Sequence, residues 1–284
     1  WGDAVWEIAT DENFTQNVQT ATTALSATGT QAGPSFTLER ETGYYTRTKY
    51  TALGQESEWS DVTYFVTKGL PVYADDVFST YLYTGNHSSQ SINNGIDLSG
   101  EGGLVWIKAR TAPSNNHELC DTVNGINKGL SSNNTQINVD TTITAFNNDG
   151  FDISNSGWYS NNSNDVDYVS WTFRKAPGFF DVVTYIGDGA GNIGREISHN
   201  LGSAPGMIII KNTGNSDSWF VFHKDARGDG GIRSPEQSFL MLQGTNTASH
   251  TTEYWGNELP GVDSFKVGGA TNHASNHYVA YIFA

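Results

Sequence analysis

The chain has 284 residues, a formal net charge of −15 at pH 7 and only 16% charged residues, while 12% of its residues are aromatic and 31 are glycine. An acidic chain repels the phosphate backbone of nucleic acid, so no nucleic acid partner is expected. The aromatic content excludes a disordered chain. No apolar run approaches the ~18 residues of a membrane span, so no membrane insertion is expected. The single cysteine, Cys120, excludes an internal disulfide.

Alternating polar and apolar residues, bounded by Gly, Asn and Asp, predict short β-strands along most of the chain. Such segments lie at 1–10, 35–40, 43–50, 61–68, 169–173, 183–186 and 278–283. Residues 123–130 and 235–242 have the spacing of a helical turn or two. The sequence therefore predicts an all-β protein built of tandem antiparallel β-sandwich domains.

An internal repeat divides most of the chain. Four blocks recur in the same order, at 83–86 and 185–188, 103–108 and 206–211, 149–151 and 263–265, and 167–173 and 277–283. A spacing of about 100 residues is the size of a domain and exceeds the ~20–50 residues of a solenoid unit. We therefore expect two related sandwich or jelly-roll-like modules, 69–176 and 177–284, joined near Pro177 and Gly178.

The first 68 residues do not follow this repeat. The strand at 6–11, the Tyr-Tyr-x-Arg strand at 41–50 and the Glu-Trp-Ser corner at 58–60 resemble a fibronectin type III module of bacteriophage tail fibres. The resemblance implies a seven-stranded sandwich of about 100 residues. Because segment 1–68 is shorter, we expect its first one or two strands to be missing and the chain to be part of a longer protein. Trp6 and Trp59 are expected to pack in the core or to stack on Arg47.

Residues 75–284 also resemble a known type of module. The blocks that carry this resemblance lie at 75–86, 92–98, 102–108, 149–151, 169–185 and 197–211. They are similar to a module of tail fibres and other tail proteins in tailed phages, notably phages of marine cyanobacteria. The resemblance implies a place in the virion tail, extracellular when mature, assembly as a homotrimer and contact with other virion tail proteins. It brings no catalytic residues, so no enzyme is expected.

Two aromatic pairs lie in polar loops rather than in alternating strands. They are Trp158 with Tyr159, and Tyr254 with Trp255, the second pair lying close to Asn257. Aromatic faces beside amide groups suit a neutral sugar, which has a flat apolar face and a hydroxyl edge. These five residues are therefore the candidate carbohydrate-binding residues. Alternatively, each Trp caps the core of its own module or packs on a neighbouring subunit.

Oxygen-rich clusters at 147–152 and 162–167 make calcium the one cofactor to consider, with Asp149, Asp152, Asp165 and Asp167 as weak candidate ligands. Neither cluster has the twelve-residue spacing of a calcium loop. The alternative is ordinary turns, in which Asn and Asp bond their own backbone. His273 and His277 are four residues apart beside a strand and form a still weaker metal candidate. His199 is expected to bond backbone groups in a turn.

Enzymatic motifs are sparse. The chain has no Gly-x-Ser-x-Gly elbow for a nucleophilic serine. A glycosidase needs a pair of carboxylates, but no spacing selects one. Arg227-Gly228-Asp229 has the letters of an adhesion tripeptide, and a solvated turn is the expected reading. The acidic candidates for a glycosidase are Glu118, Asp121, Asp149, Asp152, Asp225, Asp229 and Glu253.

The resemblance and the loop aromatics together predict a structural and adhesive virion protein, a phage tail fibre that positions binding surfaces against a host glycan or protein. A purely structural virion component, in the neck, baseplate or capsid decoration, is the first alternative. A polysaccharide-degrading tailspike enzyme is the second. Exposed loop aromatics would favour the adhesin, and a cleft with two carboxylates about 5–10 Å apart would favour the enzyme.

Overall fold

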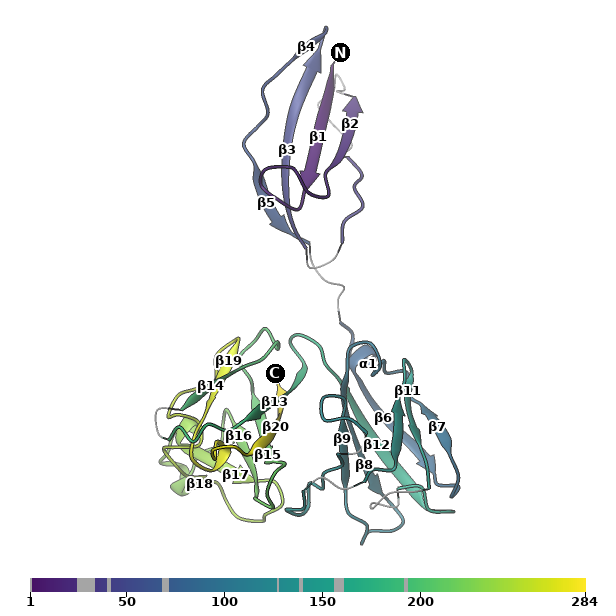
Figure 1. Cartoon of the computed structure of the whole chain (residues 1–284), viewed down its shortest axis with the longest axis vertical. Helices are drawn as coiled ribbons and strands as arrows, with labels where there is room; N and C mark the ends of the chain where they lie inside the picture. The colour runs from purple at the N-terminus through teal and green to yellow at the C-terminus, as the bar shows by residue number, and fades with distance from the viewer. Residues whose placement is uncertain are drawn as a thin grey trace. The chain divides into compact units, whose positions relative to one another are not determined.

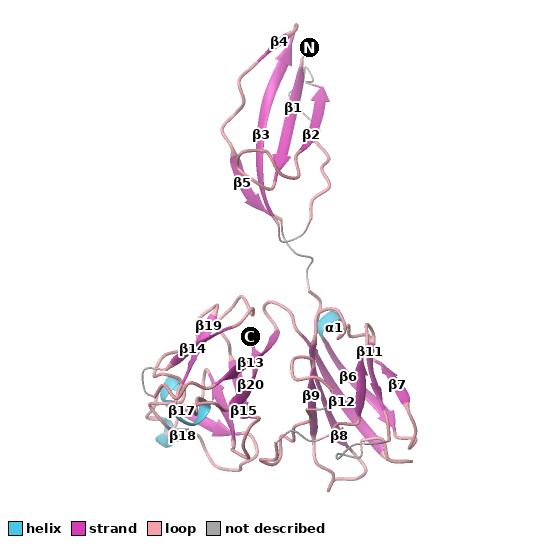
Figure 2. Ribbon diagram, viewed as in Figure 1, coloured by secondary structure: helices cyan, strands magenta, loops and turns pink. Residues whose placement is uncertain are grey.

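The computed structural model describes residues 2–24, 34–39, 42–67, 72–126, 128–137, 140–155, 161–191 and 194–284. The chain divides into two compact units, Trp1–Pro71 and Val72–Ala284 (Figure 1). Strands make up most of the regular structure that is described in both units, and helix occurs there only as short turns (Figure 2). The all-β prediction with several antiparallel sheets is therefore confirmed.

The described strands of the N-terminal unit form one antiparallel sheet. Their order is β2-β1-β3, and both β4 and β5 pair with β3. The Thr, Tyr and Val residues that fill them favour the pleated, half-buried surface of a sheet. The strands are β1 (Asp3–Ala9), β2 (Gln19–Ala24), β3 (Gly43–Ala52), β4 (Gln55–Glu56) and β5 (Thr63–Val66).

Arg47 organises one face of this sheet. Its guanidinium carbon lies 4.0 Å from the ring centre of Phe14 and 4.4 Å from that of Trp59. The same guanidinium forms an ion pair of 2.7 Å with Glu7 on the neighbouring strand. Trp59 therefore stacks on Arg47, as the sequence predicted, and Trp6 is half-buried in the sheet.

The first half of the Val72–Ala284 unit is a sandwich of two sheets, with orders β6-β12-β8-β9 and β10-β11-β7. A short helix, α1, precedes the first strand where the sequence analysis expected no helix. The elements are α1 (Ala74–Val77), β6 (Phe78–Thr84), β7 (Gln90–Asn93), β8 (Gly103–Ala109), β9 (Glu118–Asp121), β10 (Ile143–Phe146), β11 (Gly150–Ile153) and β12 (Asp167–Arg174).

The second half is a related sandwich, with sheet orders β13-β20-β15-β16-β17-β18 and β14-β19. Its strands are β13 (Phe180–Ile186), β14 (Arg195–Ser198), β15 (Met207–Asn212), β16 (Trp219–His223), β17 (Ser238–Met241), β18 (Ser249–His250), β19 (Ser264–Val267) and β20 (His277–Phe283). Three 3₁₀ turns complete it, η1 (Asp229–Gly231), η2 (Pro235–Gln237) and η3 (Gly269–Thr271). The helical turn expected at 235–242 is thus limited to η2 and continues as a strand.

The two halves share one topology, which is the repeat expected from the sequence. The order β6-β12-β8-β9 of the first half corresponds to β13-β20-β15-β16 of the second, and the pair β7-β11 corresponds to β14-β19. Tyr83 stacks on Tyr168 with ring centres 5.1 Å apart. Tyr185 and Tyr278 repeat this stack at 4.9 Å. The second half adds β17 and β18 at one edge.

The repeated Tyr-x-Gly-Asx motif has a structural role. In the first half, the Tyr83 hydroxyl donates to the Asn161 carbonyl over 2.9 Å, and the Asn162 side chain accepts from the Asn86 amide over 3.1 Å. A Cβ on Gly85 would lie 2.1 Å from a backbone carbonyl oxygen, which leaves room only for glycine. The second half repeats the arrangement with Tyr185, Thr271, Gly187, Asn272 and Asp188.

The larger sheets of the two halves share a hydrophobic core. Along β8, Val105 and Ile107 pack inside the first half, whereas Leu104 and the partly buried Trp106 pack in a cluster shared with the second half. Strands β15 and β20 divide their side chains in the same way. These strands are therefore apolar on both faces; 278–283 is a strand, as predicted, but it is buried on both faces rather than alternating between polar and apolar residues.

Hydrogen bonds also join the two halves. The Trp219 indole donates to the carbonyls of Ser131 and Asn134 over 2.9 and 3.0 Å. The Tyr281 hydroxyl donates to the Asp121 carboxylate over 2.9 Å. Residues 72–176 and 177–284 thus repeat one topology and lie within one compact unit, Val72–Ala284.

Candidate functional site

A pocket of about 520 Å³ lies where the two halves of the Val72–Ala284 unit meet. The segment after β9 supplies one wall through Val123 and Asn124 of its first turn and through Lys128. The second half supplies the other wall from the end of β13, the loop after β15 and the start of β20. The volume falls within the ~300–1,000 Å³ of small-molecule pockets. The repeat halves therefore create, at their junction, a site that neither half has alone.

Strand pairing places the second wall. Ile186 of β13 lies directly opposite His277 of β20, and the preceding pair is Tyr185 opposite Tyr278. Because side chains alternate along a strand, the tyrosine rings lie in the core of the second half, whereas Thr184 and Ile186 face the other way. Ile186 is 52% exposed, so the pocket has an apolar side chain open to solvent.

Asp121 holds the first wall in place. Its carboxylate accepts hydrogen bonds from the amides of Val123 and Asn124, over 3.0 and 2.8 Å, and from the Asn124 side chain over 2.8 Å. The fourth donor is Tyr281 of the other half. Burial raises the pKa of Asp121, and these hydrogen bonds oppose the shift. The turn that forms the wall is thus fixed to both halves through one buried carboxylate.

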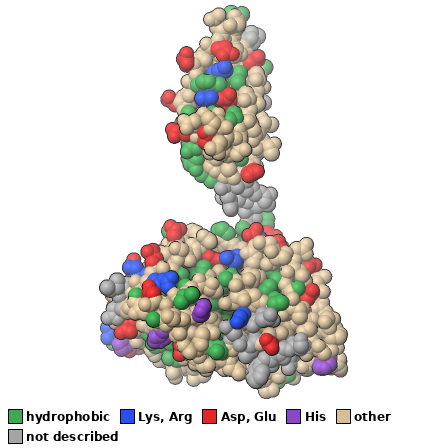
Figure 3. Space-filling view, in the orientation of Figure 1, with side chains coloured by type: hydrophobic (Ala, Val, Ile, Leu, Met, Phe, Trp, Pro, Cys, Tyr) green, Lys and Arg blue, Asp and Glu red, His purple; other side chains and the backbone are tan. Residues whose placement is uncertain are grey.

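The pocket is basic, although the chain is acidic. Lys128 and His277 line it, and none of the described lining residues is a carboxylate. Within the described ranges, no ion pair involves either residue. On the face drawn in Figure 3, acidic, basic and apolar side chains are interspersed. A pocket lined by a lysine and a histidine is suited to an anionic group.

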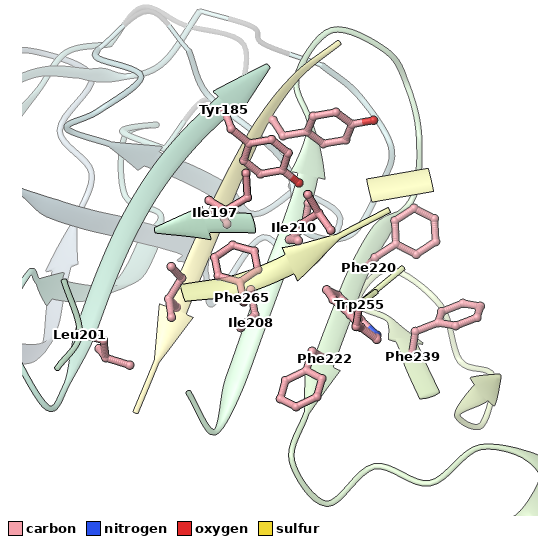
Figure 4. Close-up of a cluster of buried hydrophobic side chains, with 14 residues drawn as sticks. Tyr185, Ile197, Leu201, Ile208, Ile210, Phe220, Phe222, Phe239, Trp255 and Phe265 are labelled. Atoms are coloured by element: carbon pink, nitrogen blue, oxygen red, sulfur yellow. The ribbon is translucent and has the colours of Figure 1, made fainter. Parts of the chain in front are cut away.

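The carbohydrate candidates do not come together. Trp255 is only 1% exposed, its indole donates to the Ser238 carbonyl over 2.8 Å, and its ring meets Phe222 edge-on at 5.7 Å (Figure 4). The expectation of an exposed Trp255 is therefore corrected, and the alternative, a Trp that caps its own core, describes it. Tyr254 is half-buried against the same core, whereas Asn257 is exposed and accepts from Gln237.

The other aromatic pair, Trp158 and Tyr159, lies outside the described residues. None of the described carbohydrate candidates lines the pocket between the halves. The pocket residues Lys128, Thr184 and Ile186 were missed by the sequence analysis, and His277 was considered only as a metal ligand. Thr184, Ile186 and His277 lie in or next to repeat blocks, whereas Lys128 lies outside all of them, so no sequence signal is common to the four residues.

The calcium candidates lie in hydrogen-bonded turns and strand ends. Asp152 accepts from the Ser91 hydroxyl over 2.6 Å, Asp167 from the Thr84 hydroxyl over 2.9 Å, and Asp165 from its neighbour Asn164. The Asp149 carbonyl accepts two backbone amides of the turn after β7. Among the residues that the structure describes, no group of three or more His, Cys, Asp or Glu side chains could hold a metal ion.

Glu118 is a buried carboxyl in the core of the first half. It accepts hydrogen bonds from the Thr142 amide and hydroxyl, over 3.0 and 2.7 Å, and from the Asn161 side chain. Burial raises the pKa of Glu118 to about 7, against the opposing effect of these donors. Glu118 and Asp121 are three residues apart on β9 and therefore face opposite sides of the sheet. They do not form the flanking pair that a glycosidase requires.

The remaining motifs have structural partners. The Asp229 carboxylate of the Arg-Gly-Asp tripeptide lies 3.1 Å from Arg233 and 3.0 Å from His250. The hydrogen bond from Arg233 lowers the pKa of Asp229. His199 accepts from the Leu201 amide over 3.2 Å, which confirms the predicted turn role. The tripeptide carboxylate is thus already engaged within the protein.

The fold and the pocket define an all-β protein whose two sandwich halves form one unit. Residues 74–284 match the family described as a domain of unknown function (DUF7483), and the chain belongs to this family. The match covers both halves, so the family unit is the pair of sandwiches rather than one repeat. No curated protein and no solved structure matches the chain. In the described ranges, no helix is long and apolar enough to cross a membrane.

Proposed function

We propose that this chain is a structural and adhesive protein of a phage virion, a tail fibre in which a β scaffold presents a saccharide-binding pocket to the host surface. The observation that carries the proposal is the 520 Å³ pocket at the junction of the halves. It combines exposed apolar side chains with amide, hydroxyl and basic groups, the mixture that a saccharide needs. The resemblance of 75–284 to phage tail modules supplies the context.

The N-terminal unit supports the same proposal. Its strand order β2-β1-β3-β5 is the order of a C′-C-F-G sheet, the larger sheet of a sandwich of the immunoglobulin or fibronectin kind. We propose that this unit is part of a fibronectin type III module that connects the pocket-bearing unit to other tail proteins. In a homotrimer, several pockets on one fibre would convert weak contacts into firm attachment through effective concentration.

No reaction is part of this proposal. The buried carboxyls nearest to a catalytic arrangement, Glu118 and Asp121, face opposite sides of β9. A purely structural virion component is the second candidate. The burial of Trp255 favours it, because that residue is removed from the set of loop aromatics that would contact a ligand.

The test is a glycan array with a whole-cell binding assay on the full 284-residue chain. Ile186→Trp fills the pocket, while Ile232→Trp places the same side chain at an 83% exposed site that does not line it. We expect the Ile186→Trp protein to lose glycan and cell binding and the Ile232→Trp protein to keep both. If the folded wild-type chain binds neither glycans nor cells, the structural candidate replaces the adhesin.

A further inference from the structure

We propose that the pocket between the two halves selects an anionic saccharide, whose carboxylate or phosphate group contacts Lys128 and His277. This inference rests on the proposed function, because it names the ligand class of the same pocket. It separates an acidic host polysaccharide from the neutral sugar that the loop aromatics suggested.

The first argument is the charge of the lining. The chain has 30 acidic and 15 basic residues, so an average surface site carries a carboxylate more often than an amine. The pocket departs from this bias, since Lys128 and His277 line it and its described lining contains no carboxylate. The Asp121 carboxylate behind the first wall has its oxygens occupied by four hydrogen-bond donors. The lining therefore offers an ammonium and an imidazole to an anion, with the nearby Asp121 carboxylate turned to donors of the protein.

The second argument is that Lys128 is not used by the fold. Lys108 and Lys211, which occupy the same position in the two repeats, behave differently from Lys128. They donate to backbone carbonyls near the ends of their strands, over distances between 2.6 and 3.2 Å. Lys175 and Lys266 form ion pairs with carboxylates. For Lys128, the described residues provide neither a hydrogen bond nor an ion pair, and its side chain is exposed. Its ammonium group is therefore available to a ligand.

The third argument is the character of the other walls. Val123 and Ile186 are 43% and 52% exposed, and they give the pocket apolar surface for the flat face of a sugar ring. Thr184 and Asn124 add a hydroxyl and an amide beside them. The Asn124 nitrogen already donates to Asp121, which leaves its oxygen to accept from a sugar hydroxyl. These groups specify a hydroxylated ring in addition to a negative charge.

The experiment is isothermal titration calorimetry on the full chain with three probes. Tetragalacturonate supplies carboxylates, glucose 6-phosphate supplies a phosphate, and maltotetraose is the neutral comparison. The variants are Lys128→Glu, Lys128→Ala and His277→Gln, with Lys224→Glu as the same charge reversal at an exposed lysine that does not line the pocket. Circular dichroism and thermal unfolding show whether each variant keeps the wild-type fold.

We expect one or both anionic probes to bind, and the stronger of the two identifies the anionic group. Lys128→Ala and His277→Gln should each weaken binding about tenfold, as expected for the loss of a hydrogen bond to a charged group. Lys128→Glu should abolish binding, and Lys224→Glu should leave it unchanged. The inference is overturned if Lys128→Glu binds the anionic probe as tightly as wild type, or if neither anionic probe binds.

These outcomes are separate from failure of the proposed function. Binding of maltotetraose that Ile186→Trp blocks and Lys128→Glu does not change would leave a saccharide pocket and remove its anionic selectivity. Absence of glycan and cell binding by the folded wild-type chain would remove the adhesive function itself.

Discussion

Glu118 is a carboxyl where the repeat has an aromatic ring. Glu118 lies opposite Ile107 in the first half, and Phe220 lies opposite Ile210, the equivalent isoleucine of the second half. Phe220 packs edge-on against Tyr254 at 4.8 Å, whereas Glu118 needs donors from Thr142 and Asn161 to offset its burial. The same strand position is therefore filled by packing in one half and by a polar network in the other.

This difference makes the stability of the chain depend on pH. The folded-state pKa of Glu118 is about 7, above its ordinary value of 4.5, so the folded state favours the protonated carboxyl. The favourable contribution is complete below 4.5 and is lost as the pH rises through about 7. A shift of this size corresponds to about 3 kcal/mol between pH 4 and pH 8. Glu118→Gln should reduce this pH dependence and raise the stability at pH 8.

Urea denaturation of the full chain at pH 4, 6 and 8 measures the effect. Glu101→Gln is the control. Glu101 is exposed, so this substitution removes the same charge from the surface rather than from the core. Equal pH dependence in the wild type and in Glu118→Gln would contradict the prediction.

At the scale of elements, the strands follow from local sequence but their partners do not. The alternation in β1, β3 and β12 and the turn residues between strands were sufficient to predict an all-β chain. The repeat was predictable because the Tyr-x-Gly-Asx motif fixes a hydrogen-bonded corner in each half. The apolar runs of β15 and β20 indicate that both faces of these strands are buried, but not which part of the chain buries them. The sequence therefore did not reveal that the larger sheets of the two halves pack on each other.

The pocket was not predictable for the same reason. Val123 and Lys128 lie between β9 and β10 in the first half, and Thr184 and Ile186 lie on an edge strand of the second. Nothing in their spacing indicates that they meet, because packing of the two halves brings them together. For Trp255 the local sequence was misleading. Its polar neighbours indicated an exposed side chain, but its ring is buried in the core.

The repeated glycines give a prediction for the two corners. A Cβ at Gly85 would lie 2.1 Å from the Ser163 carbonyl oxygen, and one at Gly187 would lie 2.1 Å from that of His273. Gly85→Ala and Gly187→Ala should each destabilise the chain by about 1–3 kcal/mol, the range for forcing extra atoms into a packed site. Gly191→Ala, with open space around its Cβ position, is the control. Chemical denaturation measures all three, and a neutral Gly85→Ala or Gly187→Ala would show that the corner can relax.

At the scale of the whole Val72–Ala284 unit, the shared core predicts that the two halves unfold together. One hydrogen bond between the halves can be removed by deleting a single hydroxyl. It is the bond that the Tyr281 hydroxyl donates to the buried Asp121 carboxylate. Removing that donor leaves a buried charge with one fewer partner, which costs about 1–3 kcal/mol. Asp121 also accepts hydrogen bonds from the turn of the first half, so loss of the Tyr281 hydroxyl should lower the local stability of both halves.

Hydrogen exchange of Tyr281→Phe in the full chain tests this coupling. We expect amide protection to fall in β8 and β9 as well as in β15 and β20, since these strands line one core. Tyr81→Phe removes a hydroxyl from a 38% exposed tyrosine of the first half and should leave protection unchanged. If Tyr281→Phe lowers protection only in the second half, the halves open independently and the pocket between them is not held rigid. A decrease in both halves would mean that the core that joins the repeats also stabilises the walls of the pocket between them.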